Sequence, residues 1–160
     1  MPNWIEGTLK LRGMREDIRR FIDNELKPSS MYGERVPEGS SFVEDSSDDD
    51  YLDYTFHNEP WINETRRAFV TCDYLWMEDD YGTVSLDVKQ AWSFHADEDD
   101  INRWKDLAKE YHLDLKLYGI ECGMQFCEKI IISNNGSVMC DETIKYDDWF
   151  WECPFPNMGG

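Results

Sequence analysis

Hydrophobic and polar residues alternate at the start of the chain. Leu9 and Leu11 would face a core, because successive side chains of a strand point to opposite sides. Lys10 and Arg12 would then face away from that core. The pattern predicts a half-buried strand over residues 4–12.

Two segments carry apolar residues at the three- and four-residue spacing of a helix. The first covers residues 14–26 and is closed by Pro28. The second follows the acidic run Asp97–Asp100 and ends near His112. Carboxylates at a helix start accept from free backbone N–H groups and meet the positive end of the helix dipole. We therefore expect two helices, with a structural reason for the acidic start of the second.

The other periodic segments have strand character and are separated by turns. The sequences Asp79–Gly82 and Asn134-Asn135-Gly136 indicate a turn and a hairpin. The expected strands cover residues 51–58, 67–76, 83–94, 113–118, 124–133 and 138–146. This order predicts an α+β fold, namely a ferredoxin-like split βαβ sandwich with two helices on an antiparallel sheet, an extra C-terminal β-hairpin and an acidic loop insertion.

Composition indicates how the chain is organised. With 160 residues, of which 41% are hydrophobic, it can build one core, so we expect a single domain over 1–160. Residues 27–50 are rich in Ser, Gly, Pro and acidic side chains, and burial of so few apolar groups cannot repay the entropy of ordering. They predict a long loop or insertion. Residues 147–160 form an aromatic tail whose two prolines argue against a regular strand or helix.

Negative charge is concentrated in the middle of the chain. Residues 36–100 hold 18 Asp and Glu against 3 Lys and Arg, a net charge of −15 within the −18 of the whole chain. Such a charge disfavours direct binding to nucleic acid or to an anionic membrane, because both are recognised through Lys and Arg. It favours a basic protein as partner. Helix capping leaves several acidic clusters unexplained, and these are the expected contacts with a partner: Glu44, Asp45, Asp48, Asp49, Asp50, Asp53, Glu78, Asp79 and Asp80.

Three functions of different class are open at this point. The first is a binding protein that inhibits a host defence or DNA-handling protein by occupying its basic, nucleic-acid-binding groove, with carboxylates that imitate nucleic acid. The second is a metal-dependent nuclease or phosphohydrolase that uses Asp87, Asp114 and Lys116, since each aspartate shares a strand face with a lysine. The third is an accessory protein whose charge serves solubility alone. We favour the first, which is not an enzyme.

The aromatic tail has two interpretations. Trp149, Trp151 and Phe155 either complete a core, as a strap across the sheet, or form an exposed anchor for a partner or for a second copy of the chain in a homodimer. The strap is the simpler of the two.

No cofactor or metal site is expected from the sequence. The acidic runs lack the alternating oxygen ligands of an EF-hand loop, and the five cysteines lack the paired spacings of a zinc site. Free thiols, the absence of an 18-residue apolar run and the absence of a secretory signal at the start indicate a cytoplasmic protein of the host cell. The cysteines are Cys72, Cys122, Cys127, Cys140 and Cys153.

Several short motifs resemble one known family. They are Met1-Pro2-Asn3-Trp4, Ala91-Trp92-Ser93-Phe94 before the second helix, Leu113–Glu121, Gly123 and Phe126 before the Gly-containing hairpin. In these the chain resembles the YubB-type ferredoxin-like proteins of phages and plasmids. The resemblance covers the core and leaves out the acidic insertion. It implies the split βαβ fold and an origin in a mobile element, and it implies no catalytic residues.

Overall fold

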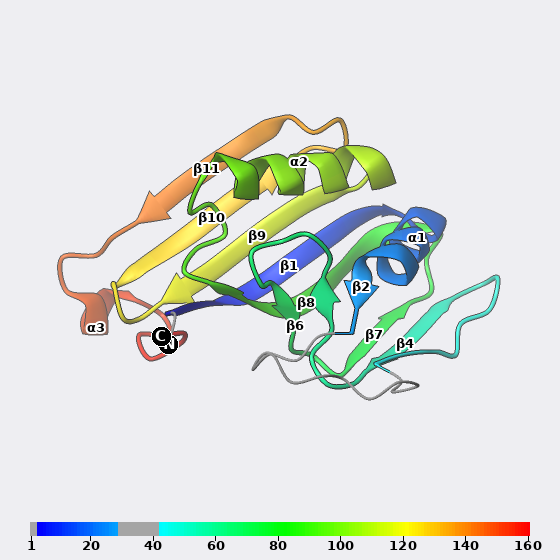
Figure 1. Ribbon diagram of the computed structural model, residues 1–160, viewed down its shortest axis with the longest axis horizontal. Coiled ribbons are helices and arrows are strands. Elements are labelled where there is room, and N and C mark those ends of the chain that lie inside the picture. The colour runs from blue at the N-terminus through cyan, green and yellow to red at the C-terminus, as the bar shows by residue number, and fades with distance from the viewer. Residues whose placement is uncertain (1–2, 29–41) are drawn as a thin grey trace.

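The computed structural model describes residues 3–28 and 42–160, which form two antiparallel sheets, two longer helices and one short helix (Figure 1). The larger sheet has eight strands in the order β11-β10-β9-β1-β8-β6-β5-β2, and the smaller has three in the order β3-β4-β7. All the pairings are antiparallel. The fold is therefore α+β and dominated by antiparallel sheet.

Long strands form one half of the larger sheet, and short strands form its other edge. The larger sheet contains β1 (Trp4–Met14), β2 (Leu26–Lys27), β5 (Trp61–Ile62), β6 (Phe69–Val70), β8 (Tyr81–Ala91), β9 (Asp114–Glu121), β10 (Phe126–Ile132) and β11 (Val138–Ile144). The smaller sheet contains β3 (Val43–Asp45), β4 (Leu52–Phe56) and β7 (Tyr74–Met77). The helices are α1 (Arg15–Glu25), α2 (Glu98–Tyr111) and α3 (Trp149–Glu152), and none of them is long and apolar enough to cross a membrane.

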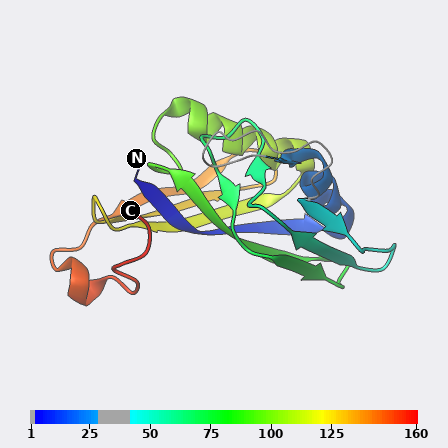
Figure 2. The same cartoon turned by 60° about the horizontal axis from the view of Figure 1, so that its bottom comes forward.

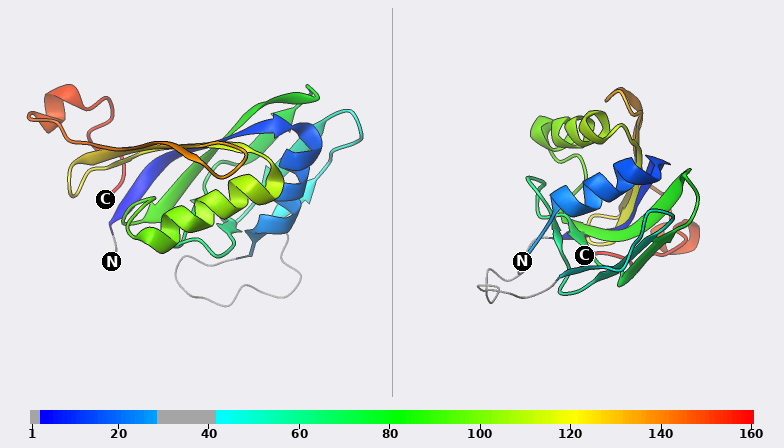
Figure 3. Two further views of the ribbon diagram at one scale, coloured as in Figure 1. Left: turned by 90° about the horizontal axis from the view of Figure 1, so that it is seen from above. Right: turned by 90° about the vertical axis from the view of Figure 1, so that its right-hand side faces the viewer.

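Helices α1 and α2 lie on the same face of the larger sheet (Figure 3). The alternation predicted for the first strand is confirmed, because Leu9 and Leu11 of β1 are fully buried in the core on that face. Lys10 and Arg12 are exposed on the opposite face. We call this second face the open face of the larger sheet.

The smaller sheet lies beside α1, on the side away from α2 (Figures 1 and 2). Its apolar residues Leu52, Tyr54 and Leu75 are buried in the same cluster as the apolar side of α1. The hydroxyl of Tyr54 donates to Oδ1 of Asp23 on that helix, at 2.9 Å. The smaller sheet therefore extends the core, and one of its faces remains outside.

The predicted strand 67–76 is wrong in extent, because the chain changes sheet within it. Phe69 and Val70 pair with β8, whereas the next strand, β7, pairs with β4 of the smaller sheet. Thr71 N still donates to the carbonyl of Asp87 at 2.8 Å, and the chain leaves the larger sheet after that bond. Strand propensity is continuous across this corner, so the sequence alone could not place it.

The predicted loop over 27–50 is also corrected where the structure describes it. Lys27 belongs to β2, and Val43–Asp45 form β3, which pairs with β4. Pairing supplies the hydrogen bonds that these polar segments need, although they bury little apolar surface. Residues 29–41 of the predicted loop lie outside the described part of the chain.

The predicted acidic start of α2 and its predicted end near His112 are both confirmed. The side chain of Asp97 accepts from the backbone N–H groups of Asp99 and Asp100, and Asp100 closes the capping box in return. Arg66 forms ion pairs with both Asp97 and Asp100. His112 ends the helix in the left-handed conformation, with φ of 54°.

The C-terminal tail contains one helical turn, α3, where the prolines argued against a helix. Pro154 follows α3 and therefore does not interrupt it. Trp149 packs with Ile120, and its indole N–H donates to the carbonyl of Pro156 at 2.9 Å. Gly160 N donates to the carbonyl of Trp4 at 2.8 Å, and α3 lies on the side of the larger sheet away from α2 (Figure 3). The tail therefore packs against one end of the open face.

Candidate functional site

Two acidic turns that are far apart in sequence lie side by side. Residues 48–50 join β3 to β4, residues 78–80 join β7 to β8, and both turns lie at the same end of the molecule (Figures 1 and 2). The guanidinium of Arg15 donates to the backbone carbonyls of Asp49 and Asp50 and to that of Glu78. It thus bridges the two turns from beneath.

Arg15 is the first residue of α1, directly after β1, and at this position its side chain reaches both turns. Its side chain is only 11% exposed, and it also forms an ion pair with Oδ1 of Asp80 at 3.0 Å. The backbone N–H of Arg15 donates to the carbonyl of Asp80 at 2.7 Å. One turn of helix further on, Arg19 donates to the carbonyl of Asp48 at 2.6 Å. Two arginines of α1 therefore hold the acidic turns by their backbones.

The carboxylates of these turns are exposed, although that of Asp80 also pairs with Arg15 of α1. Asp48, Asp49 and Asp50 are exposed, as are Glu78 and Asp79, and the side chain of Asp80 is 85% exposed. Oδ1 of Asp48 accepts from the N–H of Asp50 at 2.7 Å, which closes the first turn on itself. The structure thus brings together six of the nine acidic residues expected from the sequence.

The other three expected residues lie on the smaller sheet. Asp53 is half-buried on β4, opposite Trp76 of β7. Glu44 and Asp45 are exposed on β3 at the edge of this sheet. Because β3 and β4 follow each other around the first acidic turn, all nine expected residues belong to one region. Asp45 pairs with the buried Tyr54 and so lies at the sheet edge on the core side, whereas Glu44 is on the outer face. We call this region, the outer face and the β3 edge of the smaller sheet with the two turns, the acidic surface.

Aromatic side chains on the acidic surface were missed by sequence reasoning. Tyr74 is 53% and Trp76 is 46% exposed, and Trp76 stacks on Tyr51 with ring centroids 4.8 Å apart. Partial desolvation, and the neighbouring carboxylate of Asp53, raise the pKa of the Tyr74 hydroxyl. The signal in the sequence was the alternation in β7, whose aromatic residues face out while Leu75 faces the core.

The three residues of the tail proposed as an aromatic anchor differ in their exposure to solvent. Trp149 is 4% exposed and packs in a small apolar cluster, so it is not available at the surface. Trp151 is 86% and Phe155 is 63% exposed. The strap interpretation therefore describes Trp149, and only the other two remain candidates for an exposed anchor.

The residues of the alternative nuclease site do not meet. Asp87 lies opposite Thr8 of β1, whereas Asp114 lies opposite Arg12, four residues further along the same strand. At 3.4 Å per residue the two aspartates are about 14 Å apart along the strand direction. Asp114 is also engaged in an ion pair with Arg12 at 2.8 Å. Within residues 3–28 and 42–160, no three His, Cys, Asp or Glu side chains are arranged to hold a metal ion.

The cysteines are free thiols, and two of the three histidines lie beside carboxylates. All five cysteines are free, as expected, and burial raises the pKa of the Cys127 thiol to about 11, which suppresses thiolate formation. His57 lies 3.4 Å from Glu44, and His95 lies 2.6 Å from Asp141, each atom pair being a ring nitrogen and a carboxylate oxygen.

Comparison of the chain with the models of known protein families, with curated proteins and with solved structures gave no match. The resemblance to the YubB-type proteins therefore stays a prediction.

Proposed function

We propose that the protein is an acidic binding protein that inhibits a host defence or DNA-handling protein by occupying its basic, nucleic-acid-binding groove. The observation that carries the proposal is the pair of acidic turns held side by side by Arg15. Six carboxylates at one end of the molecule form a concentrated negative surface on a rigid support.

Holding the turns in advance matters for affinity. Neighbouring carboxylates repel one another, and without a cation beneath them the turns would separate. Arg15 and Arg19 offset this repulsion and fix the backbone before a partner arrives, which lowers the entropic cost of association. Duplex DNA presents one charge per roughly 1.7 Å of its axis, so only a dense, ordered set of carboxylates can compete for the same groove.

The aromatic rings supply a second kind of contact. Tyr74 and Trp76 are exposed beside Asp53 on the outer face of the smaller sheet. Tyrosine and tryptophan dominate interface hot spots, because they bury much area at little cost in rotamer entropy. We propose that charge guides the encounter and that these rings provide the short-range part of the binding energy.

We further propose that the core is a ferredoxin-like split βαβ sandwich to which the acidic surface has been added. The order β9-β1-β8-β6, antiparallel throughout, supports this, because α2 connects β8 and β9, which flank β1, and β6 takes the position of the second strand. Helix α1 itself leads into β2 at the far edge of the sheet. The smaller sheet comes from the insertion between α1 and β8. A mobile-element origin is the part of this proposal that rests only on the resemblance.

The test compares two variants with the same loss of charge. The first replaces Asp48, Asp49 and Asp50 by Asn. The control replaces three exposed acids away from the acidic surface, Asp106 by Asn and Glu110 and Glu142 by Gln. A partner is captured from host lysate on immobilised protein, identified, purified, and its affinity for each variant is measured as a function of salt and of added duplex DNA.

We expect the affinity of wild type to fall about tenfold or more between low and high salt, and duplex DNA to compete for the partner. The Asp48/Asp49/Asp50 variant should bind more weakly than the control variant. An affinity that is independent of salt, an absence of competition by DNA, or equal affinities of the two variants would refute the proposal. If no partner is captured under any condition, a role of the charge in solubility alone becomes the better interpretation.

A further inference from the structure

We propose that the open face of the larger sheet binds a small, phosphate-bearing anion, with the ammonium groups of Lys10 and Lys116 as its ligands. This site is separate from the acidic surface and does not depend on the function proposed above. It is a basic pocket on a chain that has 34 acidic and 16 basic side chains.

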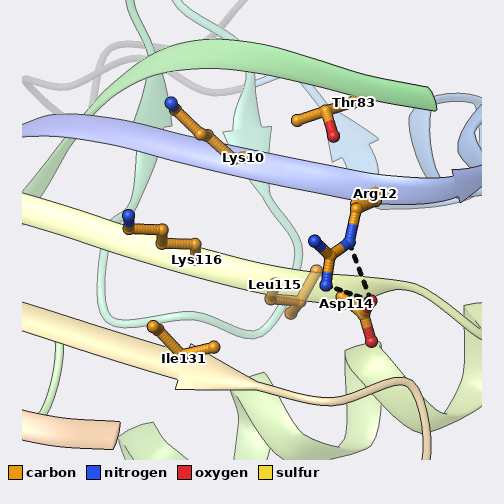
Figure 4. A pocket seen from close by; sticks show the side chains of 7 residues that line it. All are labelled: Lys10, Arg12, Thr83, Asp114, Leu115, Lys116 and Ile131. Atoms are coloured by element: carbon orange, nitrogen blue, oxygen red, sulfur yellow. Dashed lines mark hydrogen bonds and ion pairs between the residues drawn. The ribbon is translucent and has the colours of Figure 1, made fainter.

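The pocket lies across the centre of the larger sheet and has a volume of about 360 Å³. Ligand pockets of proteins start at about 300 Å³, so the space suits a small molecule. Lys10 of β1 and Lys116 of β9 are direct cross-strand partners, and Figure 4 shows their side chains next to each other on the open face. Thr83 of β8 brings a hydroxyl to the same pocket, and Ile131 of β10 brings an apolar side chain.

The two ammonium groups are available for a ligand. Among the described residues no carboxylate lies within 4.0 Å of Lys10 or Lys116. Asp114 is the only acidic residue among those that line the pocket, and both of its oxygens are occupied. Oδ2 accepts from Arg12 at 2.8 and 3.0 Å, and Oδ1 accepts from the N–H of Asn134 at 2.9 Å.

This arrangement suits a doubly charged oxyanion. Like charges directly opposite each other on two strands destabilise a sheet, so Lys10 and Lys116 are unfavourable neighbours without a ligand. A phosphate monoester carries about −1.5 to −2 charges and three acceptor oxygens near neutral pH. It can accept from both ammonium groups and from Thr83 and cancel the repulsion, while Ile131 contacts the organic part.

The position of the acidic turns favours a small anion over a nucleic acid strand. Asp80 is three residues from Thr83 along the chain, or about 10 Å in extended structure. Salt screens charges beyond about 8 Å at physiological ionic strength, so a ligand confined to the pocket is partly shielded from the turns. A longer polyanion that follows β8 would run directly into their carboxylates. At the opposite end of the open face, the tail packs against Trp4 and Ile120.

The experiment is a titration of isotope-labelled protein with inorganic phosphate, followed by backbone amide NMR shifts at neutral pH and constant ionic strength set with chloride. We expect saturable shifts confined to residues around Thr83, Lys116 and Ile131. Lys10→Met and Lys116→Met should each weaken phosphate binding about tenfold or more, because a charge-assisted hydrogen bond is lost. Lys109→Met, an exposed lysine of α2 on the other side of the sheet, is the matched control and should bind as wild type does.

Two further measurements separate a phosphate site from non-specific attraction of anions to the two lysines. Without phosphate, Lys116→Met should unfold at a higher urea concentration than wild type, because the repulsion with Lys10 is gone. A 5′-mononucleotide should bind at least as tightly as inorganic phosphate. The affinity of a single-stranded oligonucleotide, divided by its number of phosphate groups, should be no higher than that of the mononucleotide. The proposal is overturned by unsaturable or scattered shifts, by equal affinities of Lys10→Met and Lys109→Met, by a lower urea midpoint for Lys116→Met, or by preferred binding of the oligonucleotide.

Discussion

Removal of the Arg15 side chain tests whether the acidic surface depends on one buried cation. The substitution Arg15→Met keeps an unbranched stem for packing and removes the guanidinium of a side chain that is 11% exposed. The variant loses the hydrogen bonds to the carbonyls of Asp49, Asp50 and Glu78 and the ion pair with Asp80. It should be less stable, and its two acidic turns should lose their common support.

The size of the effect follows from these contacts. A hydrogen bond from a charged group contributes about 1.5–3 kcal/mol, so three of them set an upper limit of about 9 kcal/mol. The carbonyls belong to exposed turns and form hydrogen bonds with water when Arg15 is removed, and this hydration offsets most of the lost free energy. We expect a net loss of about 2–3 kcal/mol in the free energy of unfolding, which corresponds to a fall of about 5–10 °C in Tm for a chain of this length.

Urea unfolding followed by tryptophan fluorescence measures this loss, with Arg20→Met as the control on the same helix. Arg20 is 48% exposed and has one ion pair with Asp17 and one contact with the ring of Tyr111, so its loss should be about 1 kcal/mol or less. The deficit of Arg15→Met should also shrink at high salt. The Debye length falls from about 10 Å at 0.1 M to about 3 Å at 1 M, and the repulsion between the unneutralised turns falls with it.

Two results would refute this reasoning. If Arg15→Met lost no more stability than Arg20→Met, the buried guanidinium would not be the support of the turns. If its deficit were independent of salt, Arg15 would act through packing, and the electrostatic argument for the ordered acidic surface would fail.

Two more predictions concern the tail and a buried carboxylate. Trp149→Ala should lower the free energy of unfolding by about 3 kcal/mol, because Trp149 is only 4% exposed. Trp151, at 86% exposed, should change it by less than about 0.5 kcal/mol when replaced by Ala. Similar losses for the two variants in urea unfolding would disprove the interpretation of the tail as a strap. Burial raises the pKa of Glu128, which accepts from Ser93 Oγ and Phe94 N, so the folded protein binds this proton before the unfolded chain does. The stability of wild type relative to Glu128→Gln should therefore rise as pH falls from the raised pKa toward the ordinary value of 4.5. Unfolding curves measured over this pH range check the prediction. A stability difference that stayed constant or fell with pH would contradict a raised pKa of Glu128.

Local patterns were sufficient to predict the long elements. The alternation around Leu9 placed β1 and its two faces, and the periodicity of α2 with its acidic start placed that helix and its end at His112. These predictions succeeded because strand alternation, helical periodicity and capping depend on residues close together in sequence. The two-residue strands β5 and β6 and the corner at Thr71 depend instead on which distant strand supplies the hydrogen bonds.

The sequence by itself determined the amount and the approximate position of the negative charge, and it singled out the nine acidic residues that the structure gathers in one region. Only the tertiary structure decided that Arg15, which belongs to α1, bridges the two turns, and that Lys10 and Lys116 share a pocket. The physical reason is the same in both cases. Charge is a property of each residue, whereas the distance between charges depends on strand register and on helix position, which the whole core fixes at once.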